Sequence, residues 1–181
     1  MDAVVKDAEA GYVVDARTRI SFGLFKTPLG MDFLSSGSNL DITKRGMEKG
    51  LVIERAVGVM ASVTLPEGFG VQAGFFNPAT RSPALDGSGP TAPIAGEDYT
   101  FVGRGTWDRG PWHAELAYGL AQSSAEVEGT TAEDYGVFDV GVRYRQGPVT
   151  AKAEFITGSG IENQDGRDQT VWYVHGGYMV T

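Results

Sequence analysis

RTRISFGLFKTPLG, residues 17–30, is the stretch that decides the fold. Its first half alternates strictly, with apolar Ile20, Phe22 and Leu24 separated by Arg19, Ser21 and Gly23. Successive side chains of a β-strand point to opposite faces, so this period of two predicts a strand with one apolar face. Pro28 has no backbone N–H, so we expect a bulge or the end of the strand beside it, and a bulge would turn Lys26 inward.

Eight further segments repeat this alternation, and the connections between them follow a rule. The segments are 4–14, 57–65, 71–75, 99–107, 112–120, 138–145, 150–155 and 172–180. Short turns at 15–18, 66–70, 108–111 and 146–148 alternate with long connections at 35–50, 78–98, 122–134 and 158–168. Outer-membrane barrels have short periplasmic turns and longer external loops. The pattern therefore favours an all-β, antiparallel up-and-down transmembrane β-barrel.

About nine strands are too few to stand alone in a membrane. Bacterial barrels use even strand numbers, and an open sheet in lipid would leave two edges of unpaired backbone groups. We therefore expect residues 1–181 to be part of a single barrel domain, truncated at both ends. No apolar run approaches the roughly 20 residues that a membrane helix needs. The residues after Met1 lack the pattern of a signal peptide, which fits a mature or truncated piece of an exported protein.

Three segments in order resemble the phosphate-selective porin O and P family of bacterial outer-membrane channels. They are GLFKTPLGMDFLSS, KRGMEKGLVIERAVGVM and VQAGFFNP, within roughly residues 19–78, and the closing VWYVHGGYMVT looks like a later strand. The resemblance implies a sixteen-stranded barrel that assembles as a homotrimer in the outer membrane. It also implies that inward arginines and lysines guide anions, here Arg19, Arg104, Arg143 and Lys26.

The alternation assigns charged side chains to the face opposite the apolar one, and rings of fixed charge control which ions enter a narrow pore. The candidate pore-lining residues are Arg19, Lys26, Arg104, Glu115, Asp139, Arg143, Lys152 and Glu154. The simpler interpretation is that these charges hydrate the lumen and pair across neighbouring strands. Trp107 and Trp112 bracket one turn and, with Tyr144, form a candidate aromatic girdle at the membrane interface. Arg55 is read as a rim charge that reaches lipid head groups or simply faces water.

Other chemistry finds little support in the sequence. His113 and His175 are solitary, and cysteine is absent, so no zinc motif exists. The segment from Glu162 to Asp168 carries oxygen ligands suited to calcium but lacks EF-hand spacing, so a solvated loop is favoured. We expect no enzyme activity and no cofactor. A net charge of −8 argues against nucleic-acid binding and weighs against a preference for anions.

Three functions remain open. The first is a porin whose partners are outer-membrane lipid, lipopolysaccharide and small hydrophilic solutes or ions such as phosphate, which cross by passive diffusion. The second is a structural or docking barrel of an envelope complex. The third is a soluble antiparallel β-barrel that binds a ligand. Burial of Ile20, Phe22, Phe101 and Leu116 in a closed core would exclude the membrane interpretation.

Overall fold

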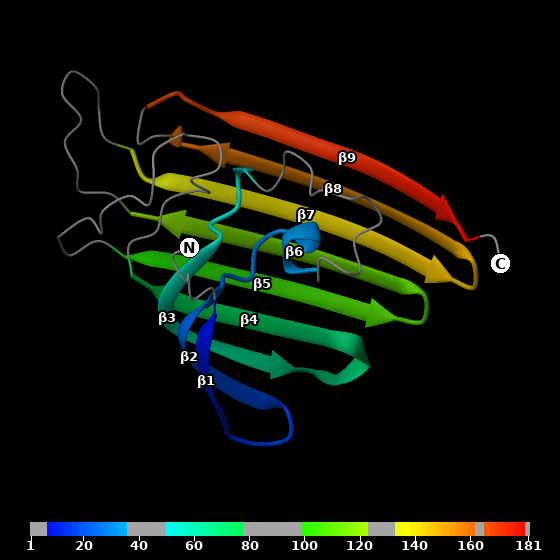
Figure 1. The fold of residues 1–181 in the computed structure, drawn as a ribbon, viewed down its shortest axis with the longest axis horizontal. Helices are drawn as coiled ribbons and strands as arrows, with labels where there is room; N and C mark the ends of the chain where they lie inside the picture. Colours follow the sequence, from blue (N-terminus) through cyan, green and yellow to red (C-terminus); the bar gives the residue numbers. More distant parts are fainter. Residues whose placement is uncertain (1–6, 36–49, 78–98, 123–132, 162–164, 180–181) are drawn as a thin grey trace, which may run out of the picture.

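Nine antiparallel strands form one sheet in which every strand pairs with its neighbours in sequence (Figure 1). The computed structural model describes residues 7–35, 50–77, 99–122, 133–161 and 165–179. The strands are β1 (Ala8–Val13), β2 (Thr18–Lys26), β3 (Arg55–Thr64), β4 (Phe69–Phe76), β5 (Thr100–Arg109), β6 (Trp112–Ala121), β7 (Tyr135–Gln146), β8 (Val149–Ser159) and β9 (Gln169–Tyr178). The predicted all-β, antiparallel up-and-down fold is confirmed.

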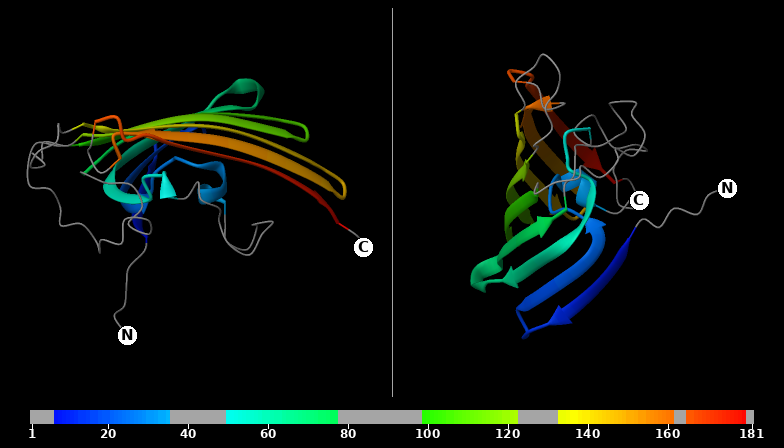
Figure 2. Two further views of the ribbon diagram at one scale, coloured as in Figure 1. Left: turned by 90° about the horizontal axis from the view of Figure 1, so that it is seen from above. Right: turned by 90° about the vertical axis from the view of Figure 1, so that its left-hand side faces the viewer.

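The sheet is curved and open. β1 and β9 are its two edges and do not pair with each other, as the two views of Figure 2 show. A twisted sheet of this curvature is consistent with part of a barrel, since barrel closure requires tilted and staggered strands. Among the described residues, no helix has the length and hydrophobicity needed to span a membrane.

The four predicted short turns are present where the sequence places them. Asp15 Oδ1 accepts hydrogen bonds from the backbone N–H groups of Arg17 and Thr18, at 2.7 and 2.8 Å, which closes the turn between β1 and β2. A short 3-10 helix, η3 (Pro66–Gly68), joins β3 to β4. Gly110 and Gly147 adopt positive φ angles of 57° and 55° in the two remaining turns, a conformation that glycine adopts without steric cost.

Near Pro28 the structure shows the second of the two expected outcomes, the end of a strand. β2 pairs with β3 without interruption up to Lys26, opposite Arg55, so the strand ends before Pro28 and contains no bulge. Its last residues bring Phe25 to the inner face, where the side chain is buried. β3 begins at Arg55. It follows a buried apolar run, residues 51–53, which the polar composition of the preceding connection does not predict.

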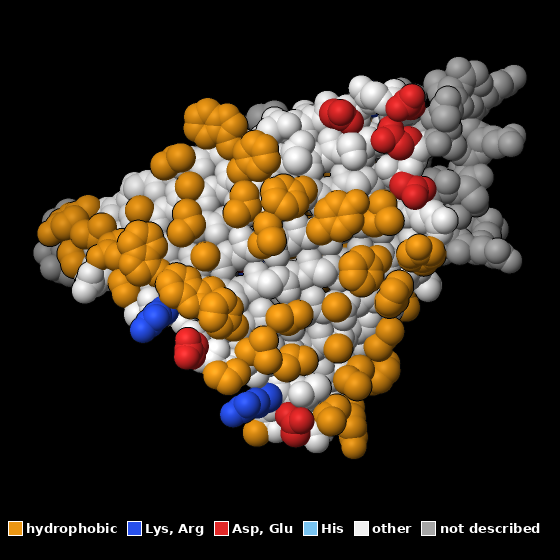
Figure 3. Space-filling model, turned by 180° about the vertical axis from the view of Figure 1, so that it is seen from behind, with side chains coloured by type: hydrophobic (Ala, Val, Ile, Leu, Met, Phe, Trp, Pro, Cys, Tyr) orange, Lys and Arg blue, Asp and Glu red, His pale blue; other side chains and the backbone are white. Residues whose placement is uncertain are grey.

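The two faces of the sheet have opposite chemistry. Large apolar side chains cover the convex face, while its few charged side chains lie toward the margins (Figure 3). Phe22, Leu116 and Val174 are exposed on this face, Val174 by 74%. Ile20 and Phe101 are partly exposed, so the four residues that would have marked a closed soluble core do not form one.

A hydrophobic core lies on the concave side, at the end of the sheet with the long connections. Residues 27–35, which include the short helix α1 (Met31–Leu34), and residues 50–54 enter the hollow of the sheet; we call them the inserted segment. The segment and the strands beneath it bury Phe25, Leu29, Phe33, Leu51, Val52, Ile53, Ala56, Phe76, Val102, Ala117, Ala121, Tyr135, Val137, Ile156 and Ile161. The core therefore anchors the chain on both sides of the first long connection against the strands.

Candidate functional site

The inserted segment is held at both of its described ends. Thr27 N–H donates to the carbonyl oxygen of Glu54 at 3.2 Å, and the Thr27 hydroxyl donates to the Ile53 carbonyl. The Tyr135 hydroxyl, from β7, donates to the carbonyl oxygen of Leu51 at 2.5 Å. These bonds satisfy polar backbone groups that burial removes from water, which is a condition for placing a loop inside a protein.

Two strand carboxylates receive the backbone N–H groups at the start of α1. Gly30 N–H donates to Asp139 Oδ2 at 3.0 Å, and Met31 N–H donates to Glu154 Oε1 at 2.8 Å. The hydroxyl of Tyr173, on β9, also donates to Glu154, at 2.6 Å. The first N–H groups of a helix have no partner within it, so carboxylates here satisfy groups that would otherwise be buried without hydrogen bonds.

Two lysines fix the same segment from different strands. Lys152 Nζ lies 2.5 Å from Asp32 Oδ1 in an ion pair in which both side chains are buried. Lys26 Nζ donates to the carbonyl oxygen of Phe33 at 2.6 Å and lies 4.7 Å from the centre of the Phe33 ring. The predicted inward position of Lys26 is thus reached at the end of β2 without the bulge that we expected to cause it.

A chain of polar contacts crosses the concave face beside the segment. Arg104 donates through Nη1 to Gln72 at 3.0 Å and through Nη2 to Glu115 at 2.5 Å. His113 Nε2 lies 2.9 Å from Glu115 Oε2, and its Nδ1 lies 2.8 Å from Asp108 Oδ1. Glu115 is fully covered, so its charge is compensated by these neighbours rather than by water.

Nearer the β1 edge, the charged groups are paired but more exposed. Arg19 Nη2 lies 2.9 Å from Glu9 Oε1, and the same oxygen accepts a hydrogen bond from Ser21 at 2.7 Å. Arg55 pairs with Asp7 at 3.0 Å. Arg55, which the sequence predicts to be a rim charge, therefore has an acidic partner within the protein. Exposed ion pairs of this kind contribute little to stability.

The eight predicted pore-lining residues all belong to the strands of this sheet, and most of them take part in these contacts. Asp139, Lys152 and Glu154 meet at the inserted segment, whereas Arg104 and Glu115 pair with each other. Arg143 lies in register between His113 and Lys152 and makes no hydrogen bond or ion pair with the described residues. Pairing across neighbouring strands, the simpler interpretation, describes Arg19 and Arg104, whereas Lys152 pairs with Asp32 of the inserted segment.

The predicted girdle residues separate into a pair and a single side chain. Trp112 and Tyr144 are cross-strand partners, and their ring centres lie 4.8 Å apart. Trp107 lies opposite Ala114 instead of Trp112, because the turn between β5 and β6 pairs Trp112 with Arg109. The register of the turn thus decides which aromatic rings meet.

Sequence reasoning missed the role of Asp32 and Tyr173. Asp32 falls just before a connection that looks polar as a whole, and Tyr173 lies in a strand whose alternation predicts no specific contact for it. The available signal was the apolar character of residues 29–34 and 51–53 on either side of the polar stretch. Apolar ends on a long connection indicate that the connection packs against the protein.

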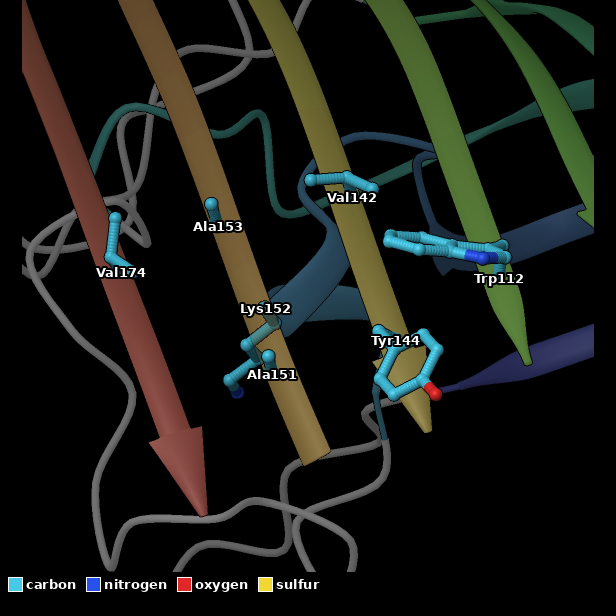
Figure 4. A pocket seen from close by; sticks show the side chains of 7 residues that line it. All are labelled: Trp112, Val142, Tyr144, Ala151, Lys152, Ala153 and Val174. Carbon is cyan, nitrogen blue, oxygen red and sulfur yellow. The ribbon is translucent and has the colours of Figure 1, made fainter. Parts of the chain in front are cut away.

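Two hollows mark the opposite faces of the sheet. A recess of about 290 Å³ on the concave side is lined by Glu9, Lys26, Leu34, Met60, Gln72 and Arg104, among others. A groove of about 410 Å³ on the convex side lies between Trp112, Val142 and Tyr144 on one side and Val174 on the other, above Ala151 and Ala153 of β8 (Figure 4). The small alanine side chains account for the groove.

Two expectations from the sequence concern bound metal ions. Within the described residues, no group of three or more His, Asp or Glu side chains is placed to hold a metal ion. The candidate calcium segment, Glu162 to Asp168, lies partly outside the described residues, and its residues 165–168 are exposed.

Comparison with models of known protein families finds no match, and comparison with curated protein sequences finds none.

Proposed function

We propose that this chain is a section of a bacterial outer-membrane porin, through which small hydrophilic solutes or ions diffuse passively. The observation that carries the proposal is the division of one curved sheet into an exposed apolar convex face and a charged concave face. A membrane barrel places the first against lipid and the second toward a polar lumen. The resemblance to the phosphate-selective porin O and P family supports the same assignment and adds a sixteen-stranded homotrimer to the proposal.

Exposing the apolar convex face to water would cost free energy, and this cost favours contact with lipid. Each Å² of apolar surface exposed to water costs about 25 cal/mol, and monomeric soluble proteins rarely expose continuous apolar patches of more than a few hundred Å². Here Phe22, Val59 and Phe75 are exposed and lie opposite one another on the neighbouring strands β2, β3 and β4. A soluble sheet would need a second layer over this face, and hydrocarbon supplies such a layer in a bilayer.

In this proposal the inserted segment narrows the lumen. It occupies the hollow of the sheet next to the long connections and is fixed by Asp139, Glu154 and Lys152. The polar contacts of Arg104 and the ion pair of Arg19 then line the remaining space on the side of β1 to β5. Solutes are selected by the size of this space and by the charges around it.

A structural or docking barrel is the second candidate, and the packed core on the concave side favours it. Leu29, Leu51 and Ile53 are fully buried there, so the segment fills volume that a wide channel would leave to water. The docking function requires a folded barrel that carries no current. The third candidate, a soluble ligand-binding barrel, requires the protein to stay monodisperse in plain buffer with its convex face exposed.

Planar-bilayer recordings on the full-length protein test the proposal. We expect discrete steps of conductance from protein purified and refolded in detergent, and no steps from detergent alone. Folded protein that inserts into the bilayer without carrying current would replace the porin proposal by the docking one. If the protein stays monodisperse after the detergent is taken away, both membrane proposals are wrong and the soluble barrel is favoured.

A further inference from the structure

His113 lies between two carboxylates on the concave face. Its Nδ1 is 2.8 Å from Asp108 Oδ1, on β5, and its Nε2 is 2.9 Å from Glu115 Oε2, two positions along β6. The imidazole side chain is only 12% exposed. Both distances lie within the range of a hydrogen bond, so each ring nitrogen has one carboxylate oxygen as its partner.

This arrangement defines the protonation state of the ring. An ionised carboxylate accepts hydrogen bonds and donates none. Glu115 Oε2 also accepts a hydrogen bond from the Arg104 guanidinium at 2.5 Å, and Asp108 is 62% exposed, so that water solvates its charged form. Both nitrogens of His113 must therefore donate, and an imidazole with two N–H groups is a cation. We call Asp108, His113, Glu115 and Arg104 the His113 cluster.

Basic side chains lie on the next two strands. Arg143, on β7, is the cross-strand partner of His113, and Arg145 follows two positions later on the same face of the strand. Lys152, on β8, lies opposite Arg143 and pairs with Asp32 of the inserted segment. The positive charge of Arg143 opposes a proton on His113. The two carboxylates are in direct contact with the ring, however, and the Coulomb interaction weakens with distance, so their attraction is the larger effect.

We propose that His113 determines the ion selectivity of the channel and makes this selectivity depend on pH. The inference rests on the proposed porin function and adds the regulation of its pore. With a protonated ring, the His113 cluster carries two positive and two negative charges and is neutral as a whole. Loss of the ring proton leaves one net negative charge on the wall of the lumen, which attracts cations and repels anions. Selectivity for cations therefore rises as pH rises through the titration of His113.

The reversal potential of the full-length channel in a gradient of dilute KCl tests the inference. Between about pH 6 and about pH 9.5, on either side of the titration of a histidine, we expect the permeability ratio of K⁺ to Cl⁻ to rise about two- to fourfold. One unit charge acting over about 10 Å of water changes the local concentration of each ion about twofold, in opposite directions.

Three variants show whether His113 is the group responsible. His113→Gln stays uncharged and should have the high-pH ratio at both pH values. His113→Arg stays charged and should have the low-pH ratio at both. His175→Gln changes the other histidine of this sequence and should keep the pH dependence of the wild type. The same pH dependence in the wild type and in His113→Gln would overturn the role of His113 while leaving the porin proposal in place.

Nitrogen NMR of the full-length protein, labelled in its histidines, tests the protonation state without any current. We expect a proton on both ring nitrogens of His113 at neutral pH, in a signal that is absent from His113→Gln. A single protonated nitrogen would overturn the inference, whatever the channel conducts. The absence of current from all folded and inserted variants would overturn the porin proposal and, with it, the role of His113 in selectivity.

Discussion

At the scale of single residues, the concave face is organised by carboxylates that accept more than one hydrogen bond. Glu154 receives the N–H groups of Met31 and Asp32 and the hydroxyl of Tyr173, so one side chain links the inserted segment to two strands. Glu115 links Arg104 and His113 in the same way. Such residues have several partners, and replacing one leaves several polar groups without hydrogen bonds.

Glu154→Ala should destabilise the folded protein by on the order of 3 kcal/mol, because two N–H groups and one hydroxyl lose their charged acceptor. Glu154→Gln keeps one carbonyl oxygen and should cost less. Urea unfolding of the detergent-solubilised protein measures both changes. Glu67→Gln, in an exposed turn, is the control and should have little effect. Equal stabilities for Glu154→Ala and the wild type would mean that the segment does not depend on this contact.

Asp15 gives a pH-dependent contribution to stability in the turn between β1 and β2. The backbone N–H of Arg17, followed by that of Thr18, stabilises the carboxylate and lowers the pKa of Asp15 below its ordinary value. A lowered pKa means that the stabilisation is present above the pKa of the unfolded chain and is lost as pH falls through the folded one. Asp15→Asn keeps the turn geometry without titration. Below about pH 4 the stability of the wild type should therefore fall toward that of this variant, and a constant difference would contradict the prediction.

At the scale of elements, the strands follow from alternation, whereas the inserted segment does not. A period of two predicts about nine strands because each has one apolar face, and the described residues form nine in the same order. The segment is different, since its partners Asp139 and Glu154 lie more than a hundred positions along the chain. Local pattern carries no information on such contacts. Even so, the apolar run from Leu51 to Ile53 could have indicated a buried segment directly after the first long connection.

Packing of the inserted segment can be tested through Leu51, which is fully buried under the strands. Leu51→Ala should cost about 2–5 kcal/mol, the sum of lost burial and a residual cavity. We expect faster hydrogen exchange in residues 50–54, with the amides in the middle of β6 and β7 little changed. Val57→Ala, on the exposed convex face, is the matched control. Exchange that stays slow in residues 50–54 would show that the segment is held without this side chain.

At the scale of the whole molecule, the proposed pore makes the inner charges accessible to electrical measurement. Arg143 makes no ion pair with the described residues and faces the same side as Lys152, so Arg143→Glu reverses a charge without breaking a contact. In a salt gradient, the reversal potential of the full-length channel should shift toward cation selectivity. Arg104→Glu should shift it in the same direction, but it also places two carboxylates beside each other.

The control for this measurement is Arg109→Glu, which changes an exposed arginine at the turn end of β5. Its distance from the middle of the sheet should leave the reversal potential nearly unchanged in physiological salt, where charges more than about 8 Å apart in water are largely screened. An unchanged potential for Arg143→Glu as well would place Arg143 away from the narrowest part of the channel.

The strictly sequential order of the strands has a consequence for how such a protein changes size. Within the described residues, each strand pairs through its backbone only with the strands before and after it, so two consecutive strands and their turn form a repeating module. Deleting or duplicating a module preserves which side chains face inward, because strand direction is restored after every second strand. The sheet can therefore widen or narrow by whole hairpins over evolutionary time, and the inserted segment keeps its anchoring residues as long as the change lies outside the strands that carry them.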